Sequence, residues 1–259
     1  MSNATEANNT VTVDNIELPQ PENLVVKYVW LSGIVLSTLC LILQLVLFKM
    51  RPKIRKLDQK ILTQLTVARL INTLLEFLMS NTLFNIYTRD LMFALYLQTD
   101  AVLVCWMFVY TKNLYDKVVL VFALQKLNFL VVSLLIWIVT IPLGVLCPVF
   151  LQIDYFDEYY KAYAWVKFII LAVNLMFFCK IFYVIITRSK NSNRNFTDII
   201  KTCVISFILV CITSLQVFLT DILSYFESGD AVTDTFCTIN SFQVLAVTII
   251  FLILAKNCI

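Results

Sequence analysis

The amino-acid sequence predicts an all-α membrane protein, a bundle of seven transmembrane helices, and three observations lead to this fold class. Hydrophobic residues make up 60% of the 259 residues and charged residues only 14%, which is more apolar side chain than a soluble domain of this length can bury. Uncharged runs of about 20 residues recur, the length that a helix needs to cross a bilayer. Lipid admits only helices and closed barrels, and long runs without strict alternation favour helices.

Seven apolar segments account for the seven helices in chain order. Charges inside them are few, with Arg69 and Glu76 in the second, Asp100 in the third and Lys167 in the fifth. Residues 1–27 form a polar tail ahead of the transmembrane domain at 28–259, and no cytoplasmic tail is expected after the last helix. The expected helices cover residues 28–48, 61–83, 91–118, 128–150, 161–187, 200–224 and 236–255.

The connections between the segments orient the bundle. The connection after the first segment reads KMRPKIRKLDQK and that after the fifth reads RSKNSNRNFTDIIK, so both are basic. The connections after the fourth and sixth segments are acidic instead. Short loops rich in Lys and Arg stay in the cytoplasm. We therefore expect the N-terminus outside, the C-terminus in the cytoplasm, and a multi-pass protein of the plasma membrane.

Two N-glycosylation patterns lie in the N-terminal tail, Asn3-Ala4-Thr5 and Asn8-Asn9-Thr10. Such a pattern is used only on the lumenal side, and the charge-based orientation places this tail there. Asn3 and Asn8 are thus candidate glycosylation sites. The alternative is that a short tail rich in Asn and Thr matches the pattern by chance.

Residue types that are missing exclude several kinds of chemistry. The chain has no histidine, which rules out His-dependent metal sites and Ser-His or Cys-His hydrolases. Its eight cysteines form no CxxC pair, so neither a zinc ribbon nor a dithiol redox motif is present. No catalytic site, metal or cofactor is expected.

Two of the expected helices carry recognisable landmarks. The third ends in Tyr115-Asp116-Lys117-Val118, an acid–base pair at the inner membrane face, and the fourth has Trp137 in mid-run with Pro142 and Pro148 beyond it. With seven crossings and an outer N-terminus, the chain resembles a G-protein-coupled receptor of the rhodopsin-like class. In that family the third helix ends in an acid–base–aromatic triplet, here with Lys117 in place of the usual Arg.

Several landmarks of that family are replaced in this chain. The sixth segment has Cys211-Ile212-Thr213-Ser214 near the place of the family's Cys-Trp-Leu-Pro motif. The fifth segment has no proline, and the seventh has no Asn-Pro-x-x-Tyr. Receptors with such replacements resemble those carried by large DNA viruses such as herpesviruses, which implies a host cell membrane.

Ionisable residues inside the membrane are costly and warrant a functional hypothesis. We expect Glu76, Asp100 and Lys167 to face a common outer cavity and bind a ligand, and the side chains expected to line it are Trp106, Gln98, Gln243 and Asn240. The alternative is a structural ion pair that joins helices, either Arg69 with Glu76 or Arg69 with Asp100.

At the inner end of the third helix, Asp116 and Lys117 have two interpretations. As a remnant of the receptor triplet, Lys117 would face the G protein and Asp116 would restrain it. Alternatively the two charges only mark the membrane–water boundary, where Lys112 and Lys126 are similar anchors.

Three cysteines and an aromatic cluster offer further sites. Cys147 and Cys237 are candidates for a disulfide on the oxidising side, with buried free thiols as the alternative, and Cys258 is a candidate for palmitoylation. The aromatic residues at the outer start of the fifth helix suit a membrane-interface belt, or an acidic, aromatic surface for a basic peptide or chemokine-like ligand. They are Tyr155, Phe156, Tyr159, Tyr160, Tyr163 and Trp165.

Three classes of function follow. The leading one is a receptor-like protein that signals through a heterotrimeric G protein, with or without a ligand. Its expected partners are membrane lipid and other receptors, with which it could form dimers, and no nucleic acid is expected. The second is an ion channel, viroporin or transporter with a polar path through Arg69, Glu76 and Asp100. The third is a non-signalling membrane protein that interacts with other receptors.

Overall fold

The computed structural model describes residues 24–50, 56–79, 86–119, 128–152 and 155–189, together with residues 238, 239, 242 and 245. Five long helices account for almost all of these residues, and no strand occurs among them, which confirms the all-helical prediction. The expected sixth helix, most of the seventh and the N-terminal tail lie outside the described residues. The helices are α1 (Leu24–Met50), α2 (Lys56–Met79), α3 (Ile86–Val118), α4 (Phe129–Gln152) and α5 (Phe156–Ser189).

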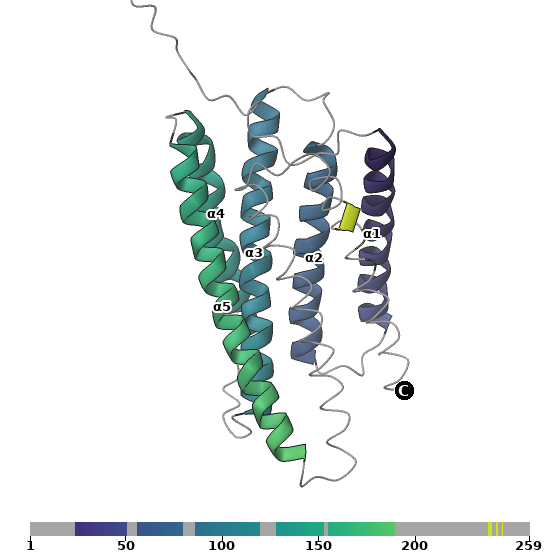
Figure 1. The fold of residues 1–259 in the computed structure, drawn as a ribbon, viewed down its shortest axis with the longest axis vertical. Helices are drawn as coiled ribbons and strands as arrows, with labels where there is room; N and C mark the ends of the chain where they lie inside the picture. The colour runs from purple at the N-terminus through teal and green to yellow at the C-terminus, as the bar shows by residue number, and fades with distance from the viewer. Residues whose placement is uncertain are drawn as a thin grey trace, which may run out of the picture.

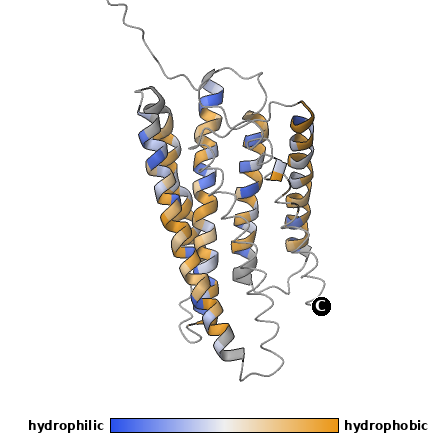
Figure 2. Cartoon of the chain, viewed as in Figure 1, coloured by the Kyte–Doolittle hydropathy of each residue, from blue (hydrophilic) through white to orange (hydrophobic). Residues whose placement is uncertain are grey.

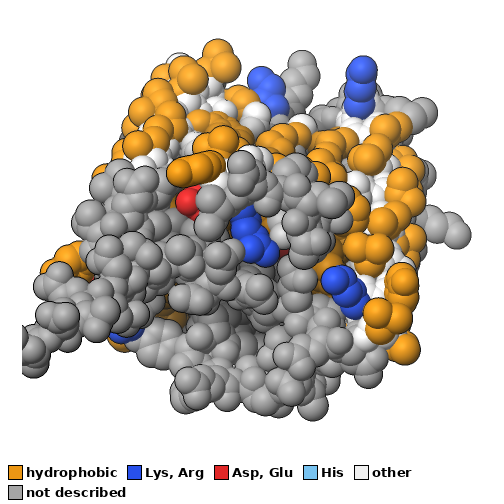
Figure 3. All heavy atoms as spheres, turned by 90° about the horizontal axis from the view of Figure 1, so that it is seen from above, with side chains coloured by type: hydrophobic (Ala, Val, Ile, Leu, Met, Phe, Trp, Pro, Cys, Tyr) orange, Lys and Arg blue, Asp and Glu red, His pale blue; other side chains and the backbone are white. Residues whose placement is uncertain are grey.

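Each of the five helices contains a stretch long and apolar enough to cross a membrane, and apolar residues dominate all five (Figure 2). Seen from above, hydrophobic side chains cover the outside of the described helices (Figure 3). On α4, for example, Leu130, Leu134 and Ile138 are all exposed. Lipid is as apolar as these side chains, so these outer faces suit a surrounding bilayer.

The helices extend beyond the predicted apolar runs. α3 begins at Ile86 instead of residue 91, and α5 begins at Phe156 instead of residue 161. Hydropathy detects only the part of a helix that lies in lipid, whereas polar residues at its ends continue the same backbone hydrogen bonding in water. At 1.5 Å per residue, Asp100 lies about 21 Å from the first residue of α3, deeper than the apolar run alone implied.

α3 occupies the centre of the described part of the bundle. It packs against α2, α4 and α5, whereas α1 packs mainly against α2, and the ribbon shows this arrangement (Figure 1). In the most apolar stretch of α3, 61% of the residues are buried, compared with 17% for α4. α3 is therefore surrounded by protein, while α4 presents most of its surface to lipid.

Two apolar clusters hold the helices around α3. The larger is built on Leu103, Trp106 and Met107 of α3 and includes Phe178 of α5. The other lies nearer the N-terminal end of α3 and contains Leu97 with Tyr163 of α5. Both clusters use α3 as their centre, so α3 sets the positions of its neighbours.

A glycine lies in the contact between α4 and α3. A Cβ added to Gly144 would lie 3.1 Å from Oε1 of Gln98 and 3.2 Å from the carbonyl oxygen of Ala94. A small residue at a membrane helix interface allows two backbones to approach in this way. Even an alanine at this position would require Gln98 or the backbone of α3 to shift by a few tenths of an ångström.

Three polar side chains reach main-chain carbonyl oxygens of a neighbouring described helix. Tyr159 donates to Leu143, the Asn72 amide donates to Tyr96 at 3.4 Å, and the Tyr163 hydroxyl lies 3.2 Å from the carbonyl oxygen of Leu97, a secondary acceptor for its single proton. In lipid no water competes for these groups. These contacts therefore tie α4 to α5, α5 to α3, and α2 to α3.

Candidate functional site

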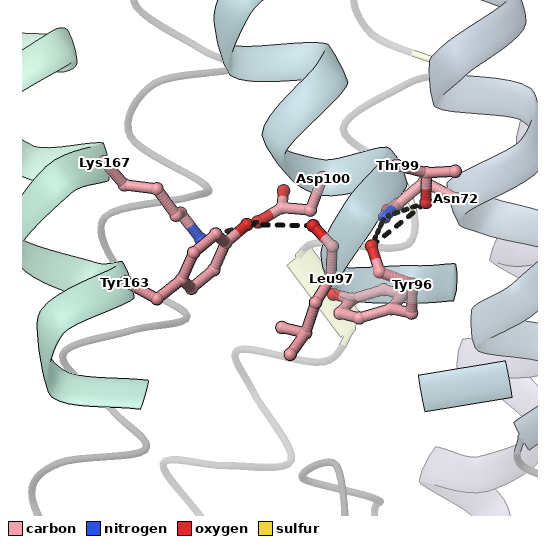
Figure 4. A network of polar contacts seen from close by, with 7 residues as sticks. All are labelled: Asn72, Tyr96, Leu97, Thr99, Asp100, Tyr163 and Lys167. Carbon is pink, nitrogen blue, oxygen red and sulfur yellow. Dashed lines mark hydrogen bonds and ion pairs between the residues drawn. The ribbon is translucent and has the colours of Figure 1, made fainter. Parts of the chain in front are cut away.

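The described helices meet in a layer of polar side chains, part of which Figure 4 shows. On α2 these side chains are Arg69, Asn72 and Glu76, spaced by three and four residues. On α3 they lie at and just before Asp100, and on α5 they are two residues four positions apart. Residues three and four apart share a helix face, so each helix directs one polar face toward its neighbours. The members are Arg69, Asn72, Glu76, Tyr96, Thr99, Asp100, Tyr163 and Lys167.

The strongest contact in this polar layer joins α3 to α5. The Lys167 ammonium donates to Oδ2 of Asp100 at 2.7 Å, and the Tyr163 hydroxyl donates to the same oxygen at 2.7 Å. The Lys167 nitrogen also lies 5.0 Å from the centre of the Tyr163 ring. A carboxylate and an aromatic face thus contact one ammonium group, and the Tyr163 hydroxyl binds the same carboxylate.

All three side chains are buried. Asp100, Tyr163 and Lys167 are only 6%, 4% and 5% exposed. Removing two charges from water costs several kcal/mol per ion, and their attraction offsets this only when the geometry is good and the remaining lone pairs are satisfied. Two short hydrogen bonds on Oδ2 give the pair this good geometry, so Asp100 and Lys167 supply each other's counter-charge within the protein.

The sequence did not predict this pairing. It offered Arg69 with Glu76 or Arg69 with Asp100 as structural ion pairs, and the structure shows an ion pair of Asp100 with Lys167. The sequence predicts Tyr163 in an aromatic belt or on an acidic, aromatic ligand surface, and the structure buries it against Asp100. Its spacing of four from Lys167 was the signal, because it places both side chains on one face of α5.

On the other side of α3, the layer continues to α2 through neutral groups. The Asn72 amide lies 3.4 Å from Oγ1 of Thr99, and the Thr99 hydroxyl donates back to the carbonyl of Leu95 at 2.9 Å. Tyr96 lies within electrostatic range of Glu76, Asp100 and Arg69. The polar layer is therefore continuous from α2 through α3 to α5.

Of the four residues predicted to bind a ligand, Glu76, Asp100 and Lys167 belong to this one layer, while Gln243 lies outside the described residues. Trp106, one of the predicted lining residues, is fully buried, with its ring 5.8 Å from that of Phe129. It belongs to the larger apolar cluster.

At the inner end of α3, the carboxylate of Asp116 pairs with Lys112 at 2.8 Å, one turn earlier on the same helix. The sequence left two interpretations of Asp116 and Lys117, a restraint of Lys117 by Asp116 or charges that mark the interface as Lys112 does. The structure adds an ion pair between Lys112 and Asp116. Both Asp116 and Lys117 are partly exposed, so this end of α3 is accessible from outside the bundle.

The remaining predicted sites divide between described and undescribed residues. Cys147 is buried and carries a free thiol. A buried free thiol was the stated alternative to a disulfide at this position. Its proposed partner Cys237, the palmitoylation candidate Cys258 and the glycosylation candidates Asn3 and Asn8 all lie outside the described residues. Within the five described helices, no group of His, Cys, Asp and Glu side chains has the arrangement of a metal site.

Comparison with known proteins adds no relative. No protein-family model matches this chain, and no curated protein matches it significantly.

Proposed function

We propose that this chain is a receptor-like protein with seven transmembrane helices that signals constitutively through a heterotrimeric G protein at the plasma membrane. The observation that carries the proposal is the position of α3. It is the most buried of the five described spans, it packs against three other helices, and its inner end carries the partly exposed Asp116 and Lys117.

The length of α3 supports a role on the inner side. Its 33 residues extend about 50 Å at 1.5 Å per residue, whereas the hydrocarbon of a bilayer is about 30 Å thick. α3 and α5 both extend past the lower ends of α1 and α2 (Figure 1). In the proposed orientation these two ends reach into the cytoplasm, where Lys117 contacts the G protein.

The residues at the outer end of the bundle are the proposed site for a polar or peptide ligand, on less evidence than the inner end offers for a G protein. Glu76 is a ligand-binding candidate in the polar layer, with Gln243 proposed beside it. Around the start of α5, Tyr155, Glu158 and Trp165 are exposed, which suits an interface belt and also a surface for a basic, chemokine-like peptide. A ligand at either place would act by favouring one of two helix packings.

The buried ion pair counts against a channel or transporter. A polar path through Arg69, Glu76 and Asp100 needs an acidic group that faces water or a passing ion. Asp100 is instead buried and bound by Lys167. Opening such a path would require this ion pair to break.

The decisive experiment expresses the epitope-tagged chain in cultured cells and measures G-protein dissociation, cyclic nucleotide level and membrane conductance together. We expect basal G-protein dissociation without a change in conductance. Lys117→Ala should abolish this signal while the protein remains at the surface, and Lys49→Ala, which removes an exposed lysine from the last turn of α1, should retain it as the control. A conductance without a G-protein signal would favour the channel, and unchanged signalling in Lys117→Ala would remove Lys117 from the proposal.

A further inference from the structure

We infer that Asp100 and Tyr163 form an ammonium-binding site inside the bundle and that the chain fills this site with its own Lys167. The inference goes beyond the proposed function and stands whether or not the protein couples to a G protein. It concerns what the site binds and why no external cation is needed to fill it.

The site has the three features that recognise a primary ammonium. The Asp100 carboxylate supplies the opposite charge and accepts a hydrogen bond at 2.7 Å. Charge-assisted bonds of this length are about twice as strong as neutral ones. The Tyr163 ring supplies an aromatic face 5.0 Å from the nitrogen, within the range at which a ring attracts a cation.

Tyr163 also orients the Asp100 carboxylate that binds the ammonium. Its hydroxyl donates to the same Oδ2 atom that accepts from Lys167 (Figure 4), and it lies 3.2 Å from the carbonyl oxygen of Leu97. One side chain therefore holds Asp100 from one side and presents its ring to the ammonium from the other. Tyr163 and Asp100 come from different helices, so the site exists only when α3 and α5 are packed together.

Occupancy by Lys167 excludes outside cations. The site is buried, and an entering amine would have to displace the Lys167 ammonium from its contacts with Asp100 and Tyr163. A buried charge that loses its partner is strongly unfavourable. A cationic ligand therefore cannot act through Asp100 in the native chain, although both Asp100 and Lys167 looked like ligand groups in the sequence.

Chemical rescue tests the inference on the purified full-length chain in detergent. Lys167→Ala keeps Cβ and removes Cγ, Cδ, Cε and Nζ, which are the atoms of n-propylammonium. We expect this variant to unfold at a lower temperature than the native chain. Millimolar n-propylammonium chloride should recover most of the lost Tm in a saturable way, and it should leave the native chain unchanged because Lys167 already occupies the site.

Three controls make the test specific. Tetramethylammonium chloride carries the charge without an N–H donor and should not recover the Tm. Lys167→Met fills the space with an uncharged chain and should not respond to n-propylammonium. The double variant Asp100→Asn with Lys167→Ala lacks the carboxylate and should not respond either.

Two results would overturn the inference. One is a recovery that is equally large with tetramethylammonium or in the double variant, and the other is no recovery at all in a folded Lys167→Ala chain. If Lys167→Ala does not fold, the surface expression of Lys167→Met is compared with that of Asp100→Asn/Lys167→Met. We expect the uncharged pair to be expressed better, because it leaves no buried carboxylate without a partner, and equal expression of the two would also overturn the inference.

Discussion

Two ion pairs on α3 have almost the same length and very different surroundings. Asp100 and Lys167 lie 2.7 Å apart, and their side chains are 9% and 6% exposed. Asp116 and Lys112 lie 2.8 Å apart, but their side chains are 19% and 45% exposed. The first pair joins two helices inside the bundle, and the second joins two turns of one helix near its inner end.

The comparison shows that distance alone does not determine what an ion pair contributes. An exposed pair within one helix contributes about 0.3–0.5 kcal/mol, because water screens the charges and the long side chains lose freedom. Breaking a buried pair costs about 3–5 kcal/mol, because one charge remains without a partner. Asp100–Lys167 should therefore affect folding, whereas Lys112–Asp116 should affect little beyond local helix stability.

The largest expected effect comes from Asp100→Asn. This change leaves the Lys167 ammonium buried without its counter-charge and should lower the free energy of unfolding by about 3–5 kcal/mol. Surface expression and the Tm of the solubilised protein measure the loss. Normal expression would mean that the carboxylate serves only a ligand and that the buried pair is dispensable.

Tyr163→Phe should have the second-largest effect. It removes the hydroxyl that donates to Asp100 but keeps the ring beside Lys167. A hydrogen bond to a charged group contributes about 1.5–3 kcal/mol, so the loss should be smaller than for Asp100→Asn. The Tm of Tyr163→Phe is compared with that of Tyr155→Phe, whose side chain is exposed and should tolerate the change.

A third case is a buried polar group without a partner. Asn174 lies two turns beyond Lys167 on α5, is only 1% exposed, and its amide nitrogen and oxygen have no hydrogen-bond partner among the described residues. Asn174→Leu should therefore raise the free energy of unfolding, by about 1 kcal/mol, because an unsatisfied buried group is costly. A lower Tm for Asn174→Leu would indicate that the amide has a partner beyond the described helices.

The smallest effect is expected for Lys112→Gln, which breaks the exposed pair with Asp116. The free energy of unfolding should change by at most about 1 kcal/mol, and the change should shrink further in high salt because the pair is exposed. A loss as large as that of Asp100→Asn would remove the distinction between the two pairs. The Tm of the two variants, measured at low and high salt, decides this.

The presence of membrane-length helices could be predicted from the sequence, and their ends could not. A lipid-crossing segment must be apolar, so its place is visible in composition. The sequence does not predict the start of α3 at Ile86, because Arg89 and Asp90 are polar. Polar residues are well solvated both in a helix and in a loop, so hydropathy does not distinguish the two outside the membrane.

The partners in the polar layer were harder to predict than its members. The sequence placed Asp100, Glu76 and Lys167 around one outer cavity, because the level of a residue in the membrane follows from its position along a helix. Which of them meet depends on how each helix is rotated and on which neighbour it packs against, and a single sequence does not contain that information. The sequence alone therefore did not pair Asp100 with Lys167, and the packing of α3 against α5 brings the two together.

The three contacts that end on main-chain carbonyls have a consequence for how this protein tolerates mutation. The acceptors belong to Leu143, Leu97 and Tyr96, but every amino acid offers the same carbonyl oxygen with a second lone pair to share. Substitutions at the accepting positions therefore leave these contacts intact, whereas the donors Tyr159, Tyr163 and Asn72 have few replacements. Saturation mutagenesis should show this asymmetry at the partly buried Leu143, which should tolerate more substitutions than Tyr159, whereas Leu97 also belongs to an apolar cluster and should be intolerant for that reason.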